Sequence, residues 1–280
     1  MKILITGGNG FLGKELCSYF QAKEKYVVYK TDRRTLDPSV YENVKLILEE
    51  VDVDVVIHTA VKGGKRNQKE DIEDFYTNMM MFQNLRKFSH KYKYMFNFGS
   101  GAEFDRQENI SLASEKDIFN RMPADYYGMA KNLISRQISQ DENNIYNLRL
   151  FGCFGEFEEP QRLFRASYDR LSHQQDALIS GDKKMDYFYA QDIGLVMEHI
   201  IRNPGLNIPK DINLCYKDKY LLSEYVEIIK DLTKSDNGVI IEGKSATDYT
   251  GCYRNLAKLD IDLKGIEKGV SECLKNWTKS

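Results

Sequence analysis

The sequence predicts an α/β fold, in which a doubly wound parallel sheet is accompanied by a smaller C-terminal α/β lobe. Three observations lead to this prediction. A short apolar strand at residues 3–6 runs into a glycine turn and then into an amphipathic helix over 11–20. Buried-strand patterns at 26–30, 51–60 and 94–98 alternate with helical patterns. Strands that alternate with helices form parallel sheets, because each crossover helix covers one face of the sheet.

The glycine turn is the most specific of these signals. Gly7, Gly10 and Gly13 fit the GxxGxxG variant of the dinucleotide fingerprint. Glycine allows a tight turn and a close approach of a pyrophosphate, and the N-terminus of the next helix offers free N–H groups to the phosphates. A tight turn without a ligand is the alternative. We predict a Rossmann-type unit whose first cofactor contacts are Gly7, Gly10, Phe11, Leu12 and Gly13.

The end of the strand at 26–30 should meet the adenosine ribose of the cofactor. An acid there binds the ribose hydroxyls and favours NAD(H), whereas an arginine pairs with a 2′-phosphate and favours NADP(H). Asp32 stands beside Arg33, and Arg34 follows. The sequence therefore favours NADP(H) and leaves NAD(H) possible, with a solvated charged loop as the alternative.

Further cofactor contacts are expected at the carboxyl ends of other strands. Thr59, Ala60 and Val61 follow the strand at 51–60, whereas His58 lies inside it and is expected to be a packed core histidine. The remaining predicted contacts are Asn78 on a long helix over 71–90, Phe98 and Leu150 on strands, and Tyr127 and Lys131.

A serine, a tyrosine and a lysine form the predicted catalytic set. Ser100 follows the strand at 94–98 in a glycine-lined corner, and Tyr127 and Lys131 open a helix that runs to about residue 140. Residues i and i+4 share a helix face, and an ammonium beside a phenol lowers the phenol pKa. Tyr127 can then exchange a proton with a carbonyl or alcohol oxygen. The polar segment 103–123 between them is predicted to be irregular.

The bulk composition excludes several function classes. The 280 residues carry 40 basic and 42 acidic side chains, so no strong field favours nucleic acid or a membrane surface. No apolar run reaches the roughly 18 residues of a membrane span. The five cysteines are scattered without a CxxC pair. We therefore expect a reduced, cytoplasmic protein without a metal site.

These motifs together resemble the extended short-chain dehydrogenase/reductase family, the NAD-dependent epimerases and dehydratases, in its nucleotide-sugar branch. The chain is most similar there to GDP-fucose synthase and the 4-keto-sugar-nucleotide reductases. Residues 149–155 and 181–192 resemble two further family segments, and 249–259 resemble a helix of the substrate lobe. The resemblance implies an NAD(P)-binding domain over 1–155, to which 182–203 return, and a substrate-binding lobe formed by 156–181 and 204–280.

The resemblance also implies a mechanism, a nucleotide-sugar substrate and a homodimer. Tyr127 would pass a proton to or from a sugar oxygen, Ser100 would orient that oxygen, and Lys131 would hold the nicotinamide ribose. The hydride would move between the nicotinamide and the adjacent carbon. The helices at about 71–90 and 127–141 would pack against those of a second copy.

Departures from the family pattern reduce the number of reactions expected for this chain. The 4,6-dehydratases carry an acid pair where this chain has Gly101 and Ala102, and GDP-fucose synthase carries its epimerisation cysteine at the position of Ala102. Its epimerisation histidine has no counterpart in 161–166. Glu103 is expected to point away, because side chains of an extended segment alternate. Dehydration and epimerisation at carbons 3 and 5 are therefore not expected.

The leading hypothesis is an NADP(H)-dependent reductase of a 4-keto-6-deoxy sugar nucleotide, which the chain length also favours. A 4-epimerase with tightly bound NAD and a non-catalytic NADP-binding protein stay open. Predicted substrate contacts are Lys62, Gly101, Ala102, Arg162 and Arg165, the three cations as partners of the diphosphate or, alternatively, as parts of an exposed face. Asp186, Tyr187 and Asp192 are expected to join the lobes or touch the substrate.

Overall fold

The computed structural model describes residues 1–64, 70–141, 144–244 and 246–278. Six parallel strands form its central sheet, in the order β10-β6-β4-β3-β1-β2. Their bounds are β1 Lys2–Thr6, β2 Val27–Lys30, β3 Val55–His58, β4 Tyr94–Ser100, β6 Ile145–Leu150 and β10 Asp211–Leu214. The chain places β2 on one side of β1 and β3 on the other, so the strand order reverses at β1, where sheets of this kind bind their ligands. The predicted doubly wound sheet is confirmed.

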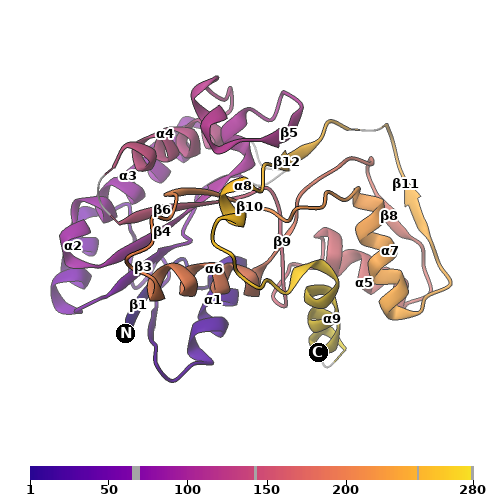
Figure 1. Ribbon diagram of the computed structural model, residues 1–280, viewed down its shortest axis with the longest axis horizontal. Helices are drawn as coiled ribbons and strands as arrows, with labels where there is room; N and C mark the ends of the chain where they lie inside the picture. Colours follow the sequence, from indigo (N-terminus) through magenta and orange to yellow (C-terminus); the bar gives the residue numbers. More distant parts are fainter. Residues whose placement is uncertain (65–69, 142–143, 245, 279–280) are drawn as a thin grey trace.

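Helices cover both faces of the sheet (Figure 1). One face carries α1 (Phe11–Gln21) and α6 (Ala190–Arg202), and the other carries α2 (Tyr41–Glu50), α3 (Ile72–Lys87) and α4 (Tyr126–Gln140). Within β1, Ile3 and Ile5 pack into the core with α1 and α6, whereas Leu4 packs into the core with α2 and α3. This alternation explains why the strand reads as a continuous apolar run, because both of its faces are buried.

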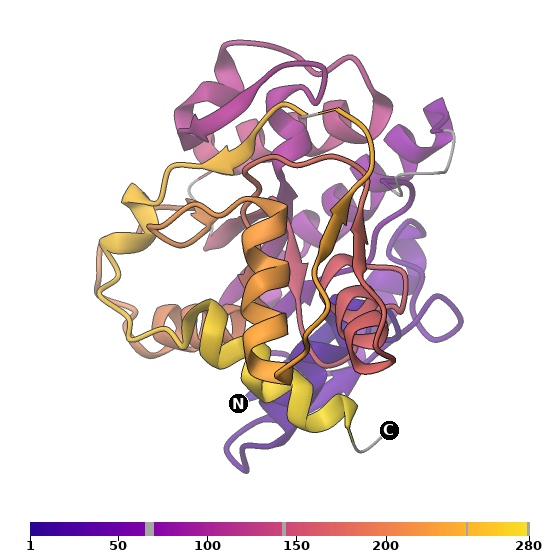
Figure 2. The ribbon, with the colours of Figure 1, turned by 90° about the vertical axis from the view of Figure 1, so that its right-hand side faces the viewer.

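A smaller lobe packs around its own core, which Figure 2 turns toward the viewer. Its elements are α5 (Leu163–Ser172), α7 (Leu222–Thr233), α9 (Gly265–Trp277) and the parallel pair β8 (Ala177–Ile179) and β11 (Val239–Ile241). The pair β7 (Cys153–Phe154) and β9 (Phe188–Tyr189) connects this lobe to the sheet. Cys153 and Phe188 belong to the core of the sheet, whereas Phe154 and Tyr189 belong to the core of the lobe.

The C-terminal third divides differently from the prediction. Residues 204–280 were assigned to the substrate lobe, but β10 is an edge strand of the central sheet. Residues 249–259 are not a helix of the lobe. They form β12 (Tyr249–Gly251) and the short helix α8 (Arg254–Ala257), which packs against β10. Four-residue strands are too short to show a clear periodicity, so the sequence carries little signal for them.

The segment 103–123, predicted as irregular, is also more ordered than expected. It contains β5 (Ile110–Ala113) and the 3-10 helix Glu115–Phe119, and a further 3-10 helix, Gly101–Phe104, begins directly after Ser100. Strand β5 pairs in parallel with β12. Because β12 lies far from β5 along the chain, no local sequence pattern predicts this pairing.

Candidate active site

The glycine turn between β1 and α1 is built as the fingerprint requires. Gly7 has a φ of +69°, and a Cβ there would lie 2.7 Å from the Cα of Ala60. A Cβ on Gly13 would lie 2.3 Å from the carbonyl oxygen of Gly7, so this glycine allows the helix to pack on the turn. At Gly10 the nearest atom would be 3.4 Å away, which leaves room for a side chain. Gly10 is also the N-cap of α1, so no capping side chain competes with a phosphate for the first N–H groups of the helix.

In the loop after β2, Asp32 and Arg33 have different contacts. The Asp32 carboxylate accepts hydrogen bonds from the Asn9 amide at 2.7 Å and from the Arg34 N–H at 2.9 Å, so it holds the glycine turn and its own loop in place. The Arg33 side chain is 88 % exposed and pairs with Asp37 at 3.2 Å. An exposed pair of this kind contributes little, so Arg33 is available to a ligand.

The end of β3 lies against the glycine turn, as expected for a cofactor edge. The Thr59 hydroxyl donates to the Thr6 carbonyl at 2.6 Å, and Val61 is half exposed. Asn78 of α3 binds the backbone of the loop after β3. Its amide donates to the Lys62 carbonyl at 2.8 Å, and its oxygen accepts from the Lys62 N–H at 3.0 Å. A direct contact of Asn78 with the cofactor stays a prediction.

Ser100, Tyr127 and Lys131 come together at the carboxyl end of β4. The buried Lys131 ammonium donates to the Phe98 carbonyl at 2.7 Å and lies 5.9 Å from the centre of the Tyr127 ring. Burial lowers the pKa of Lys131 to about 8. Burial raises the pKa of Tyr127, and a hydrogen bond with Ser100 offsets part of that rise. In register, Ser100 of β4 pairs with Leu150 of β6, which places Leu150 at the same edge.

Glu103 is turned away from the reacting groups, although the reason given for this expectation was wrong. The segment after Ser100 is a 3-10 helix and not an extended strand. One carboxylate oxygen of Glu103 accepts from the Ser100 N–H at 2.8 Å, and the other lies 2.6 Å from Nε of the fully buried Arg149. Glu103 is thus bound in a structural ion pair and does not replace the acid that Gly101 and Ala102 lack.

The three cations predicted to bind a diphosphate have different partners in this structure. Lys62 pairs with Glu73 at 3.1 Å, at the start of α3. The Arg162 guanidinium lies 4.9 Å from the centre of the Phe11 ring, beside the start of α1, and donates to the Cys153 carbonyl at 2.9 Å. Arg165 pairs with Asp169 at 2.9 Å, and its guanidinium lies 5.3 Å from the centre of the Trp277 ring of α9. A contact of Arg165 with the substrate stays a prediction.

The polar residues expected between the lobes do connect segments. Asp186 pairs with Lys219 at 2.8 Å and accepts from the Gly251 N–H at 2.7 Å, which ties β12 to the segment directly before β9. Asp192 accepts from the N–H groups of Lys264 and Gly265, at the start of α9. His58 is a core residue, as predicted: it is buried, its ring bonds to the Thr6 hydroxyl at 2.8 Å, and burial lowers its pKa to about 3.

Sequence reasoning missed three residues around Tyr127. The Arg106 guanidinium lies 5.8 Å from the centre of the Tyr127 ring and pairs with Asp125 at 2.7 Å. A Cβ on Gly64 would lie 2.8 Å from Cε2 of Tyr127, so the loop after β3 covers the ring. The third residue is Tyr249 of β12, whose hydroxyl reaches Gly101. Arg106 lies in the segment predicted to be irregular, Gly64 lies just after the predicted cofactor contacts Thr59, Ala60 and Val61, and Tyr249 lies in a segment predicted to be a helix.

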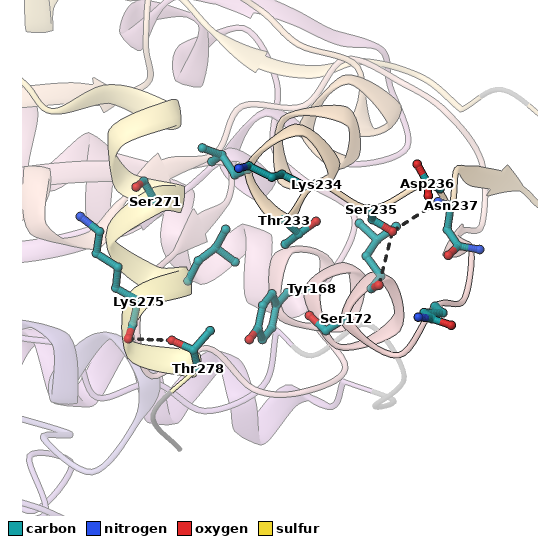
Figure 3. Close-up of a pocket in the computed structure, with 14 residues that line it drawn as sticks. Tyr168, Ser172, Thr233, Lys234, Ser235, Asp236, Asn237, Ser271, Lys275 and Thr278 are labelled. Carbon is teal, nitrogen blue, oxygen red and sulfur yellow. Dashed lines mark hydrogen bonds between the residues drawn. The ribbon is translucent and has the colours of Figure 1, made fainter.

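A separate groove of about 980 Å³ opens on the smaller lobe, between α5, α7 and α9 (Figure 3). Its lining includes Tyr168, Thr233, Ser271 and Lys275, and it shares no residue with the predicted site. In the part of the chain that the structure describes, no cluster of three metal-ligating side chains occurs, and no helix is long and apolar enough to cross a membrane.

Comparisons with known proteins agree with this geometry. Residues 3–215 match the model of the NAD dependent epimerase/dehydratase family. A curated relative, CDP-abequose synthase from Yersinia pseudotuberculosis, is 24% identical over 94% of this chain and 93% of its own.

Two solved structures share the fold. A GDP-mannoheptose C4 reductase from Campylobacter jejuni with NADP bound has a TM-score of 0.82 and 18% identity, covering 99% of this chain and 98% of its own. A GDP-L-fucose synthetase from Naegleria fowleri bound to NADP has a TM-score of 0.78 and 15% identity, covering 99% and 93%. At these identities the likeness shows the fold alone.

Proposed function

The chain belongs to the NAD dependent epimerase/dehydratase family, and from that premise we propose that it is an NADP(H)-dependent reductase of a 4-keto-6-deoxy sugar nucleotide. The family match confirms the resemblance that the motifs indicated. The proposal is supported by relatives and neighbours whose names include a sugar-nucleotide synthase and a C4 reductase. The reaction would convert a ketone to a secondary alcohol, with one hydride from NADPH and one proton from the protein.

The observation that carries the proposal is a complete Ser-Tyr-Lys set beside positions that cannot move protons. Ser100, Tyr127 and Lys131 lie at one corner, where Gly101 and Ala102 offer no acid or base. Glu103, the next residue, is held by Arg149. Elimination or epimerisation at a neighbouring carbon needs a base that removes a proton from carbon, whereas ketone reduction needs only a proton donor at oxygen.

The residues of the chain divide the work as follows. The Ser100 hydroxyl would bind the ketone oxygen and orient it toward Tyr127. The Tyr127 hydroxyl would give its proton to that oxygen as negative charge develops there. The nearby Lys131 ammonium would favour the phenolate that remains, because an opposite charge stabilises the ionised form. A bound nicotinamide cofactor supplies the hydride in this chemistry.

The turn after β1 fits a dinucleotide. The first N–H groups of α1 would hold the pyrophosphate, and the space beside Gly10, which a Cβ would enter, would receive it. Arg33 would bind the 2′-phosphate of NADP(H), and Lys131 the nicotinamide ribose. The family description says NAD and both solved neighbours hold NADP, so the preference for NADP(H) rests on the exposed Arg33.

A homodimer and a cytoplasmic location complete the proposal. Tyr76 and Met80 on α3 and Tyr126 on α4 are exposed apolar or aromatic side chains, and these two helices pack against each other. A second copy would cover them. The five cysteines are free thiols, as in proteins of a reducing compartment.

The test is NADPH consumption with a panel of 4-keto-6-deoxy sugars linked to GDP, CDP, dTDP and UDP, with NADH measured in parallel. We expect rapid oxidation of NADPH with at least one member, and NMR of the product should show carbons 3 and 5 unchanged. If no member is reduced with either cofactor, the reductase proposal is wrong. Tight NAD in that inactive sample would then favour the 4-epimerase, and tight NADP a non-catalytic binding protein.

A further inference from the structure

The space above Gly101 is filled by a residue from the far end of the chain. A Cβ on Gly101 would lie 2.6 Å from Cζ and 2.7 Å from the hydroxyl oxygen of Tyr249. The phenol of Tyr249 therefore lies directly on the bare Cα of Gly101, next to Ser100. Any larger residue at position 101, including the acid found there in the dehydratases, would displace it.

The backbone and ring of Tyr249 are fixed from several sides. Its N–H donates to the Lys184 carbonyl at 2.8 Å, and its carbonyl accepts from the Asp186 N–H at 3.1 Å. Its ring meets Phe151 edge-to-face, with the ring centres 5.4 Å apart. The Lys183 ammonium lies 5.4 Å from the ring centre. These contacts hold the hydroxyl in one place, which a group that orients a substrate requires.

Ser100 acts on the pKa of Tyr249 in the same direction as on that of the predicted proton donor. It lies beside Gly101, on which the Tyr249 hydroxyl rests, and it lowers the pKa of both phenols, Tyr249 and Tyr127. Burial raises the pKa of Tyr249, so this phenol keeps its proton at neutral pH. It can donate a hydrogen bond to a ligand at this corner, but it cannot act there as a base.

We propose that Tyr249 is a further substrate-contacting residue of this active site, whose hydroxyl donates a hydrogen bond to the oxygen that is reduced. Ser100 and Tyr249 then hold that oxygen together while Tyr127 transfers its proton. The inference rests on the proposed function, because it assigns the second donor of that reaction. It also explains why residue 101 is a glycine, since only glycine at this position leaves room for the phenol of Tyr249.

The test compares Tyr249→Phe with Tyr253→Phe and wild type in the full chain. Tyr249→Phe keeps the ring against Phe151 and removes only the hydroxyl, and Tyr253 is a half-buried tyrosine four residues away. The measurements are kcat and KM with the 4-keto sugar nucleotide that wild type reduces, the Kd for NADPH and the melting temperature. We expect kcat/KM to fall about 10²- to 10³-fold in Tyr249→Phe, as for the loss of one donor at a developing oxyanion. NADPH affinity and melting temperature should not change, and Tyr253→Phe should match wild type.

Each other outcome is informative. An active wild type with an equally active Tyr249→Phe enzyme overturns the inference and leaves the proposed function standing. A Tyr249→Phe variant that loses melting temperature and NADPH affinity together with activity shows a structural role and also overturns it. A wild type that reduces no member of the panel overturns the proposed function, and this inference with it.

Discussion

Arg149 Nε lies 2.6 Å from Glu103 Oε2, and both side chains are completely buried. The same guanidinium lies 2.7 Å from Asp211 of β10, while the other oxygen of Glu103 accepts from the Ser100 N–H. One arginine therefore links the edge strand of the sheet to the backbone that carries the predicted catalytic serine. Its ion pairs with Glu103 and Asp211 place Ser100 relative to β6 and β10.

Arg149→Met should destabilise the protein strongly. The change leaves Glu103 and Asp211 as buried carboxylates without their cation, which typically costs about 3–5 kcal/mol. Urea unfolding at neutral pH measures the loss. The matched control is Lys93→Met, which removes an exposed pair with Asp54 and should change the free energy of unfolding little. If the two variants lose the same free energy of unfolding, the buried ion pair stabilises the protein no more than the exposed one.

Tyr127→Phe should abolish most of the proposed reductase activity without unfolding the protein. Loss of a positioned proton donor typically lowers kcat by about 10²- to 10⁴-fold. The variant keeps the ring under Gly64, so its melting temperature should stay near that of wild type. Steady-state kinetics with the best member of the sugar-nucleotide panel measures the effect. Full turnover in this variant would falsify the catalytic assignment of Tyr127.

Glu15 gives a prediction for the pH dependence of stability. It lies buried on α1, and burial raises its pKa from 4.5 to about 7, although the Phe157 N–H donates to it at 2.7 Å. Because the pKa is higher in the folded state, the unfolded chain loses this proton first as the pH rises. The folded state is therefore progressively disfavoured between about pH 4.5 and 7, and this stability is regained on acidification.

The matching experiment compares urea unfolding of wild type and Glu15→Gln at pH 5 and pH 8. Wild type should lose about 2–3 kcal/mol more than the variant between these two values, at roughly 1.4 kcal/mol per pKa unit. Glu24→Gln, at an exposed acid, should behave as wild type. Parallel pH profiles for wild type and Glu15→Gln would contradict the raised pKa.

Gly10→Ala should separate folding from cofactor binding. A Cβ at this position finds no atom closer than 3.4 Å, so the free protein should keep its melting temperature. The same methyl group enters the space proposed for the pyrophosphate, so the Kd for NADPH should rise at least about 10-fold. Calorimetric titration measures this, with Gly205→Ala at an open surface position as the control. Unchanged affinity would place the pyrophosphate elsewhere.

Arg33→Ala should reverse the cofactor preference. Loss of a charge-assisted hydrogen bond to a 2′-phosphate costs about 1.5–3 kcal/mol, so the KM for NADPH should rise roughly 10- to 100-fold while the KM for NADH stays constant. Arg34→Ala is the neighbouring control. If Arg34→Ala carries the effect instead, the phosphate contact belongs to that residue, and if neither changes it, the enzyme uses NAD(H).

The fold of the first 150 residues could be predicted because its strands are buried on both faces and its crossover helices have a clear period. The glycine turn and the Tyr127–Lys131 spacing are local patterns, and the structure brings Ser100 to them. Tyr249, Arg106 and the Glu103–Arg149 pair were missed because their roles arise from pairings between distant segments. β12 beside β5 is such a pairing, and no local periodicity encodes it.

Lys62 and Arg165 illustrate a second limit of prediction from sequence, which concerns the direction of a side chain. An arginine or a lysine in the right stretch of sequence fits a phosphate by chemistry alone, but the nearest carboxylate decides where its side chain lies. In this structure Lys62 pairs with Glu73 and Arg165 pairs with Asp169. Side-chain direction of this kind depends on tertiary contacts, which the sequence pattern does not contain.

The position of β10 at the edge of the sheet bears on how the chain is completed during synthesis. The ribosome makes α5, β8 and α6 before it makes the last strand of the central sheet, and it makes β12 later still. A nascent chain that ends before residue 211 therefore exposes one edge of β6 and lacks the partners of Arg149 on β10. The central sheet can therefore be completed only after residue 214 has been made, when α5 and β8 of the smaller lobe already exist.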